Sequence, residues 1–254
     1  MNSRARFQNA FTLIELLVVI AILIMLVSMA YSPCVRSKSK AQQIVCLNNS
    51  RQITIGIHMY LDDQVNNSPG NTNAARSPFL NWTEYRKLIG EHVGVKTAPS
   101  PEDRLFACPA DTFFYDMSGS RRGFVREPLH EQTNQVFTSY AYNAGMVTTR
   151  PTTNSDGTIT PGTTNFYGIA GMRLESIAHP ARTVLIAEAP AYAPYSWHQP
   201  KKPLSMQNSK FNDSKNIVGF VDGHVRYFNM HYDGKNFAWA SNPPAKYDYQ
   251  WSGD

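Results

Sequence analysis

The N-terminal apolar block constrains the fold of this chain more than any other feature of its sequence. Across residues 11–35 only one side chain, Glu15, is charged at neutral pH. A helix needs about 20 predominantly apolar residues to cross a bilayer, and the block supplies them. Arg4 and Arg6 precede it, which favours a cytoplasmic N-terminus and export of the residues after the block. We therefore expect a single-pass inner-membrane protein whose helix spans the membrane to about residue 32.

Three explanations of the block compete. The first is an ordinary secretory signal cleaved after Ala30, because Ser28-Met29-Ala30 fits a small-x-small cleavage site. The second is a plain membrane anchor. Neither explains Glu15, because a carboxylate costs roughly 2.5–3.5 kcal/mol near the centre of a membrane helix and neither a signal nor an anchor needs one. The third explanation starts from the residues around Glu15.

The stretch Ala10-Phe11-Thr12-Leu13-Ile14-Glu15-Leu16-Leu17 resembles the class III signal of type IV pilins and type II secretion pseudopilins, with Ala10 where glycine is commoner. The resemblance implies that a prepilin peptidase cleaves between Ala10 and Phe11 and then N-methylates Phe11. It also implies that Glu15 pairs with the N-terminal ammonium of a neighbouring subunit and sets the assembly register. A carboxylate near a helix N-terminus is stabilised by the helix dipole and, more strongly, by a cation.

Helical patterning continues beyond the block. One apolar face with helical spacing comprises Cys46, Ile53, Ile57, Tyr60 and Leu61. We therefore predict a leader at residues 1–10, one long helix at 11–61 and a globular head at 62–254. Pro33 is expected to kink or end this helix, and Gly56 weakens the prediction.

The clearest strand patterns lie late in the sequence, at residues 183–187, 217–221 and 224–228. Asp222-Gly223 separates the last two, and Asp-Gly between β-rich runs predicts a hairpin with a type I′ turn. Asp222 is therefore interpreted as a turn residue rather than as a catalytic acid or a metal ligand. The pattern predicts an α+β fold whose head is built on an antiparallel sheet.

Three other segments have recognisable local character. Residues 66–71 are a predicted loop, and residues 82–92 are a predicted short helix. The stretch 147–165 is rich in Thr, Asn, Gly and Pro, which indicates an exposed excursion with a hairpin at Asp156-Gly157.

The head also resembles a known group. Residues 216–225 (NIVGFVDGHV) look like the "H-x9-DG" element that accompanies this signal in a large bacterial group of prepilin-like proteins, although Asn212 stands where the histidine belongs. Phe106-Ala107-Cys108-Pro109 and Ser139-Tyr140-Ala141-Tyr142-Asn143 support the same resemblance. A pilin-like head fold is what the resemblance implies.

The chain has three cysteines, Cys34, Cys46 and Cys108, all after the expected cleavage position. An exported head lies in an oxidising space, where disulfides persist. Cys46–Cys108 is the favoured pair, because Cys46 faces the head, and Cys34 then stays free or pairs between subunits. The cysteines lack CxxC spacing, which disfavours a structural zinc site. No cofactor is expected, although calcium could find oxygen ligands at Asp111, Asp213 and Asp222.

Charge and motifs exclude other classes of function. The net charge is +5, but the only tight basic cluster, at residues 36–40, suits lipid phosphate and has no nucleic-acid motif beside it. No H-E-x-x-H, G-x-S-x-G, P-loop or G-x-G-x-x-G motif occurs, so no enzyme is expected.

We therefore expect a pilin-like or pseudopilin subunit of a type IV pilus or type II secretion-type filament, with its head in the periplasm or outside the cell. Its expected partners are prepilin peptidase, other pilin-like subunits and the inner membrane, without nucleic acid. The alternatives are a membrane-anchored protein that binds a surface or saccharide ligand, and a secreted hydrolase cleaved after Ala30.

Overall fold

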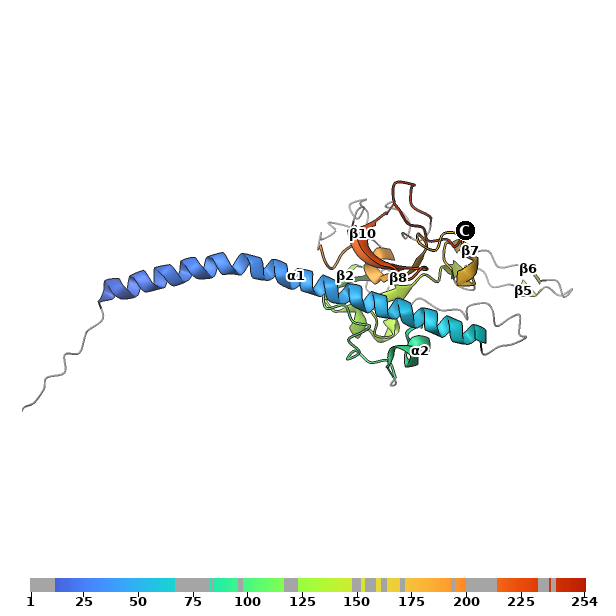
Figure 1. Cartoon of the computed structure of the whole chain (residues 1–254), viewed down its shortest axis with the longest axis horizontal. Helices are drawn as coiled ribbons and strands as arrows, with labels where there is room; N and C mark the ends of the chain where they lie inside the picture. The colour runs from blue at the N-terminus through green and yellow to red at the C-terminus, as the bar shows by residue number, and fades with distance from the viewer. Residues whose placement is uncertain are drawn as a thin grey trace, which may run out of the picture. The chain divides into compact units, whose positions relative to one another are not determined.

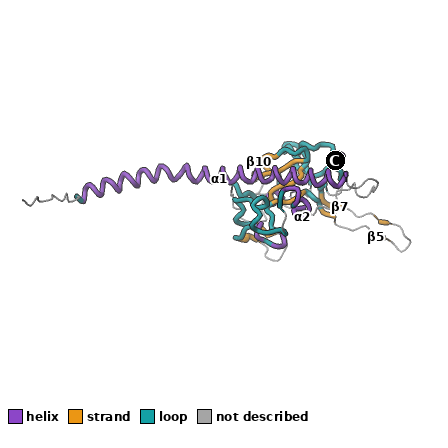
Figure 2. The backbone as a smooth tube through the Cα atoms, turned by 60° about the horizontal axis from the view of Figure 1, so that its bottom comes forward, coloured by secondary structure: helices purple, strands orange, loops and turns teal. Residues whose placement is uncertain are grey.

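The computed structural model describes residues 12–66, 83, 85–95, 98–116, 123–147, 152–153, 159–160, 164–169, 172–192, 195–199, 214–232, 238 and 241–254 (Figures 1 and 2). The chain divides into two compact units, Met1–Ala41 and Gln42–Asp254, and each is described by itself. Between residues 29 and 36, which include Ala30 and Cys34, only the backbone is described. Other positions named above lie outside the described residues: Ala10, Phe11, Asp156, Gly157, Asn212, Asp213 and residues 67–71 of the predicted loop, whose first residue, Asn66, belongs to α1.

The first element, α1, begins at Leu13 and ends at Asn66. It is longer than predicted because no glycine or proline follows Gly56 until Pro69. Pro33 does not end it, since helical turns on both sides carry the backbone through the position where the proline lacks an N–H. Among the described residues, no helix has the combination of length and apolar character that a membrane crossing requires.

The centre of the head is a four-stranded antiparallel sheet with the order β10-β9-β8-β3. Its strands are β3 (Tyr140–Tyr142), β8 (Val184–Glu188), β9 (Ser214–Phe220) and β10 (Val225–Met230). The three strands predicted late in the sequence correspond to β8, β9 and β10. The α+β prediction with an antiparallel sheet is confirmed, and the arrangement of an N-terminal helix followed by such a head is consistent with a pilin-like fold.

The head also contains short strand pairs and short helices. The antiparallel pairs are β1 (Phe114–Asp116) with β2 (Gly123–Val125), β4 (Met146–Val147) with β7 (Thr164–Phe166), and β5 (Thr152–Thr153) with β6 (Ile159–Thr160). The short helices are α2 (Tyr85–Ile89), η1 (Glu91–Val93), η2 (Leu129–Glu131), η3 (Thr133–Gln135), η4 (Leu174–Ser176) and η5 (Ala189–Tyr192).

Two of the local predictions are met with changes. The single helix predicted at 82–92 is two short helices, α2 and η1, with Gly90 between them. The predicted hairpin at Asp156-Gly157 lies in a gap of the described residues, but β5 and β6 on either side of the gap pair antiparallel.

The β9–β10 hairpin forms at the predicted place, but the predicted turn type is wrong. The Phe220 N–H donates to the His224 carbonyl (2.9 Å), and the Gly223 N–H donates to the Phe220 carbonyl (3.0 Å). Three residues therefore form the loop, and of Asp222 and Gly223 only Gly223 has a positive φ, of 92°. A three-residue loop needs the left-handed conformation at one position, whereas a type I′ turn needs it at two.

The second half of α1 packs directly on this sheet (Figure 1). A Cβ atom at Gly219 of β9 would lie 2.5 Å from Thr54 Oγ1 of α1 and 3.0 Å from Ile186 Cγ2 of β8. Only glycine permits this close approach of helix and strand. The predicted apolar face points into this interface: Cys46, Ile53, Ile57 and Tyr60 are buried, and Leu61 is partly buried.

The sheet is covered on both faces. A first core, between α1 and the sheet, includes Ile53, Ile57, Tyr140 and Ile217. A second core contains Val184, Val218, Phe220, Tyr249 and Trp251. Alternate residues of β9 enter the two cores, as the two-residue period of a strand requires.

Candidate functional site

The first candidate site is the N-terminus of α1, which two side chains cap. The Thr12 carbonyl accepts a helical hydrogen bond from the Leu16 N–H (3.3 Å). The Glu15 N–H donates to Thr12 Oγ1 (3.3 Å), and Glu15 Oε2 accepts from the N–H (2.9 Å) and the hydroxyl (2.7 Å) of Thr12. This reciprocal pattern is a capping box, which satisfies donors that a helix start leaves unpaired. Glu15 therefore supports α1 within its own chain.

The apolar surface that comes after this cap has the character of a binding surface. From Leu13 to Val27 the large apolar side chains are 46–82% exposed, and they occupy consecutive positions on all sides of the helix. A helix that is apolar all round is stable only where lipid or other protein covers it. The predicted cleavage position, between Ala10 and Phe11, lies just before the first described residue.

The second candidate site is buried in the head, where α1 meets the loop at residues 104–111. Cys46 and Cys108 form a disulfide with a Cα–Cα distance of 5.2 Å, and they are the pair favoured from the sequence. Asn49 Nδ2 of α1 donates to the carbonyls of Arg104 (2.9 Å) and Ala107 (3.2 Å). The disulfide therefore joins two segments that side-chain hydrogen bonds also hold together.

The two sequence pieces that resemble prepilin-like proteins lie side by side at this place. The Ser139 N–H donates to the Phe106 carbonyl (2.8 Å), and the Cys108 N–H donates to Ser139 Oγ (2.9 Å). Ser139 Oγ in turn donates to Asp111 Oδ2 (2.8 Å). The first piece thus contributes Cys108 to the disulfide, and the second contains β3.

Asp111 does not fit the suggested calcium site. Its side chain is fully buried, and its oxygens accept from the Leu129 N–H (2.8 Å), the His130 N–H (2.9 Å), His130 Nδ1 (3.0 Å) and Ser139 Oγ (2.8 Å). Four donors occupy the lone pairs that a calcium ion would need. Asp111 is a structural acceptor that organises the loops around it.

Asp222 behaves as the turn residue expected from the sequence. Its Oδ1 accepts from the His224 N–H (3.1 Å) and lies 2.5 Å from His224 Nδ1, and both side chains are about one-third exposed. A carboxylate that bonds the backbone two residues on is a common way to fix a turn.

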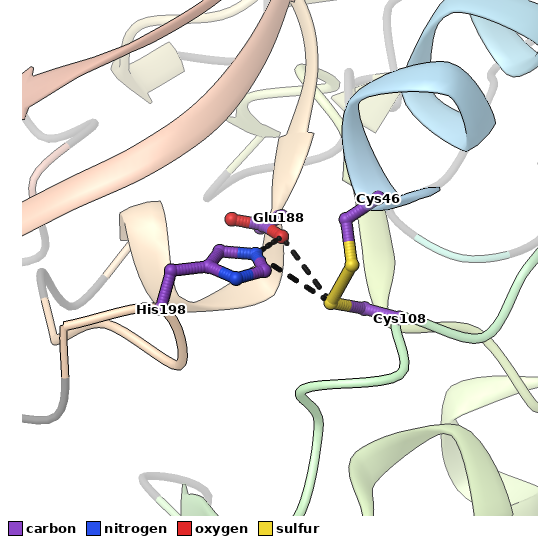
Figure 3. Close-up of side chains that lie close together, drawn as sticks. All are labelled: Cys46, Cys108, Glu188 and His198. Carbon is purple, nitrogen blue, oxygen red and sulfur yellow. Dashed lines mark hydrogen bonds and ion pairs between the residues drawn. A yellow bond between two sulfur atoms is a disulfide. The ribbon is translucent and has the colours of Figure 1, made fainter. Parts of the chain in front are cut away.

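Two residues that sequence reasoning missed, Glu188 and His198, lie beside the disulfide (Figure 3). His198 Nε2 is 2.8 Å from Glu188 Oε1, and Cys108 Sγ lies 3.4 Å from the same oxygen and 3.7 Å from the same nitrogen. A disulfide sulfur carries no hydrogen, so these last two distances are contacts without a shared proton. All four side chains are buried.

Neighbouring backbone fixes both missed side chains. Glu188 ends β8, and its Oε2 accepts from the Ile217 N–H of β9 (2.9 Å). His198 follows Ser196, whose hydroxyl donates to the Lys215 carbonyl (2.7 Å) and accepts from the His198 N–H (3.2 Å). The sequence could have pointed to Glu188, because an acidic residue directly follows the apolar residues of β8. It could not have pointed to His198, which has no other metal-ligand or catalytic residue type at a recognisable spacing.

This arrangement does not support nucleophilic catalysis. In a Cys–His–carboxylate triad the carboxylate binds one imidazole nitrogen and the thiolate faces the other. Here Glu188 Oε1 and Cys108 Sγ approach the same nitrogen, Nε2, while His198 Nδ1 has no hydrogen-bond partner among the described atoms. The sulfur is also held in the disulfide. Two sulfurs, an imidazole and a carboxylate nevertheless form a possible set of metal ligands.

Comparison with known proteins adds a finding at the N-terminus. A family model described as "Prokaryotic N-terminal methylation motif" matches residues 5–31. No curated protein and no solved structure matches the chain. The matched segment includes Ala10, Phe11 and the capping pair Thr12 and Glu15. The chain therefore carries a type IV pilin-like signal, of the kind that prepilin peptidase processes.

Proposed function

We propose that this protein is a structural subunit of a type IV pilus or type II secretion-type filament, cleaved between Ala10 and Phe11 and assembled through α1. One observation carries the proposal: the methylation motif leads directly into a capped helix whose apolar side chains are exposed on all sides. The motif by itself supports processing. The exposed apolar helix supports assembly, because such a surface requires a covering partner.

Before assembly, this surface is covered by the inner membrane, and afterwards by the helices of other subunits. The apolar side chains from Leu13 to Val27 suit both environments, because both lipid and packed helices keep them away from water. Cleavage places a new ammonium at Phe11, one helical turn before Glu15. The ammonium of a neighbouring subunit would neutralise this carboxylate and fix the register of the two helices.

The head, residues 62–254, belongs on this proposal to the periplasmic or extracellular surface of the filament. The buried disulfide supports an oxidising location. The partial resemblance to the "H-x9-DG" group, with Asn212 in place of the histidine, supports a prepilin-like rather than an enzymatic head. We accordingly propose a non-catalytic role, which the unsuitable geometry of Cys108, Glu188 and His198 for nucleophilic attack supports.

The first experiment determines the mature N-terminus by mass spectrometry of protein taken from its own cells. We expect N-methylated Phe11. A mature chain that begins at Tyr31 would instead establish secretion after cleavage at Ala30, and an intact Met1 would establish a plain anchor. Either result would remove the basis for filament assembly.

The second experiment separates the two roles of Glu15. Glu15→Gln keeps a side chain that can cap the helix at this position but removes the charge, whereas Glu15→Leu removes both. Thr12→Ala removes the hydroxyl of the cap and keeps the charge. If pairing with a neighbour's ammonium drives assembly, both Glu15 variants are excluded from filaments while Thr12→Ala is incorporated. Normal incorporation of Glu15→Gln would show that the residue serves the cap alone.

A further inference from the structure

The buried cluster of Cys46, Cys108, Glu188 and His198 draws its members from four separate segments of the chain (Figure 3). Cys46 comes from α1, Cys108 from the loop after residue 104, Glu188 from the end of β8, and His198 from the segment 195–199. Their sulfur, nitrogen and oxygen atoms all lie within 4.8 Å of one another. A buried carboxylate and a buried imidazole at contact distance from a sulfur are ligand types that a metal ion can use.

The two distances from Cys108 Sγ match two of the six edges of a metal-centred tetrahedron. With zinc bonds of about 2.3 Å to sulfur and about 2.0–2.1 Å to nitrogen or oxygen, tetrahedral angles place sulfur about 3.6 Å from nitrogen or oxygen. Cys108 Sγ lies 3.4 Å from Glu188 Oε1 and 3.7 Å from His198 Nε2. Cys108 Sγ therefore already lies at the distances from Glu188 Oε1 and His198 Nε2 that a zinc site requires.

Of the other four edges, the two from Cys46 Sγ to Glu188 Oε1 and His198 Nε2 are within 4.8 Å, and the remaining two must lengthen. Glu188 Oε1 and His198 Nε2, now 2.8 Å apart, would separate to about 3.3 Å once a metal replaces their shared proton. The two sulfurs would separate to about 3.8 Å, which requires that their bond is broken. Either the disulfide or a metal ion can thus join α1 to the loop at residues 104–111, but not both at the same time.

We propose that the reduced protein binds one Zn²⁺ through Cys46 Sγ, Cys108 Sγ, Glu188 Oε1 and His198 Nε2. This ligand set, with two thiolates, one imidazole and one carboxylate, suits a tetrahedral borderline cation. The proposal holds whether or not the protein assembles into filaments. It departs from the expectation that cysteines without CxxC spacing disfavour zinc, because the fold brings together ligands that lie far apart in the sequence.

The chemical step has a defined balance. A dithiol reductant donates two electrons, the Cys46–Cys108 bond breaks, and the dithiol becomes its own disulfide while both protein sulfurs take up protons. Zn²⁺ then displaces these two protons, which pass to solvent. A metal at His198 Nε2 requires that nitrogen to carry no proton, so the ring proton belongs on Nδ1, which has no hydrogen-bond partner among the described residues.

The remaining contacts hold the ligands in place when the disulfide opens. Glu188 Oε2 keeps the Ile217 N–H, so the carboxylate can bind a metal through Oε1 without losing its anchor on β9. Ser196 holds the backbone of His198, and Ser139 holds that of Cys108. Partners of this kind orient metal ligands in known sites, and their loss typically costs about 10–100-fold in affinity.

Cobalt provides the test, because tetrahedral Co²⁺ bound to thiolate gives characteristic d–d and charge-transfer absorption. The full chain with Cys34→Ser is reduced with a dithiol, freed of the reductant without air and titrated with Co²⁺. We expect these bands at one cobalt per chain, their loss on adding Zn²⁺, and none of them with the oxidised chain. Zinc should also raise the melting temperature of the reduced chain.

The variants identify the ligands. His198→Gln and Glu188→Gln should each weaken cobalt binding by more than the roughly 10–100-fold that a ligand's partner contributes, and His198→Gln should alter the d–d bands. His224→Gln changes a histidine outside the cluster and should bind cobalt normally. The proposal is overturned if the reduced chain binds cobalt no better than the oxidised chain, or if binding is unchanged in both cluster variants. Reduction that unfolds the head without recovery on adding zinc would overturn it equally.

Discussion

The Cys46–Cys108 disulfide should be among the largest single contributions to the stability of the head. The bonded residues are 62 positions apart, so the bond closes a long loop in the unfolded chain. The chain-entropy relation gives about 4 kcal/mol at 25 °C for a loop of this length. We therefore expect Cys46→Ala with Cys108→Ala to lower the free energy of unfolding by at least this amount.

Urea unfolding of the full chain in detergent, followed by the fluorescence of buried Trp197 and Trp251, measures this loss. Cys34→Ser in every chain prevents other pairings. The midpoint should fall, and the m-value should rise, because an unfolded chain without the cross-link exposes more surface. The matched control is the chain that retains Cys46 and Cys108, measured after reduction and with a chelator present. Because both sulfurs remain, this control lacks the cavity that the double alanine variant creates.

Restriction of the unfolded chain predicts a specific order of stabilities. The oxidised and reduced chains, which have the same side chains, should differ by about 4 kcal/mol, and the double alanine variant should be weaker still. A difference below about 1 kcal/mol between the oxidised and reduced chains, with equal m-values, would refute the view that the bond acts by restricting the unfolded state.

Three further predictions concern the head. Gly219→Ala should destabilise it by about 1–3 kcal/mol, since the new Cβ would lie 2.5 Å from Thr54 Oγ1, and adding Thr54→Ala should recover part of that loss in thermal unfolding. Asn143→Ala should cost at least about 2 kcal/mol in urea unfolding, because Asn143 Nδ2 donates to the buried carbonyls of Val184 and Trp251 (2.8 Å each). The comparison is Asn242→Ala, which removes only partly buried hydrogen bonds, and a cost for Asn143→Ala below that variant's would contradict the reasoning. Burial raises the pKa of several tyrosines above the usual 10.0. Above pH 10.0 the unfolded chain therefore releases tyrosine protons that the folded chain keeps. The free energy of unfolding should then fall by up to about 1.4 kcal/mol per pH unit for each of these tyrosines. Tyrosinate absorbance during alkaline unfolding checks this prediction, because these residues should ionise only with the unfolding step: Tyr85, Tyr140, Tyr195 and Tyr249.

The parts of the fold that the sequence predicted well are those in which local pattern and tertiary role agree. The β-rich runs of β8, β9 and β10 are apolar enough to indicate strands without ambiguity, because β8 and β9 are buried on both sides. The apolar face of α1 was likewise predictable, because helical spacing alone selects the residues that meet the sheet. Agreement of this kind also led to the favoured cysteine pair, since Cys46 lies on that face.

The parts that could not be predicted depend on contacts between distant segments. β3 has only three residues, and it is a strand because Tyr140 and Tyr142 pair with β8. The left-handed conformation at Gly223 alone, rather than at two positions, follows from the loop length that the register of β9 and β10 requires. Glu188, His198 and the disulfide come from segments far apart in the sequence, so their proximity follows from the tertiary fold and no spacing in the sequence indicates it.

The cap at the start of α1 leaves half of its carboxylate unused. Thr12 donates both of its hydrogen bonds to Glu15 Oε2, and Oε1 has no hydrogen bond within the described residues. Glu15 can thus cap its own helix through Oε2 and still bind a cation through Oε1. If the protein assembles as proposed, it could leave lipid and join neighbouring subunits without unwinding the first turn of α1.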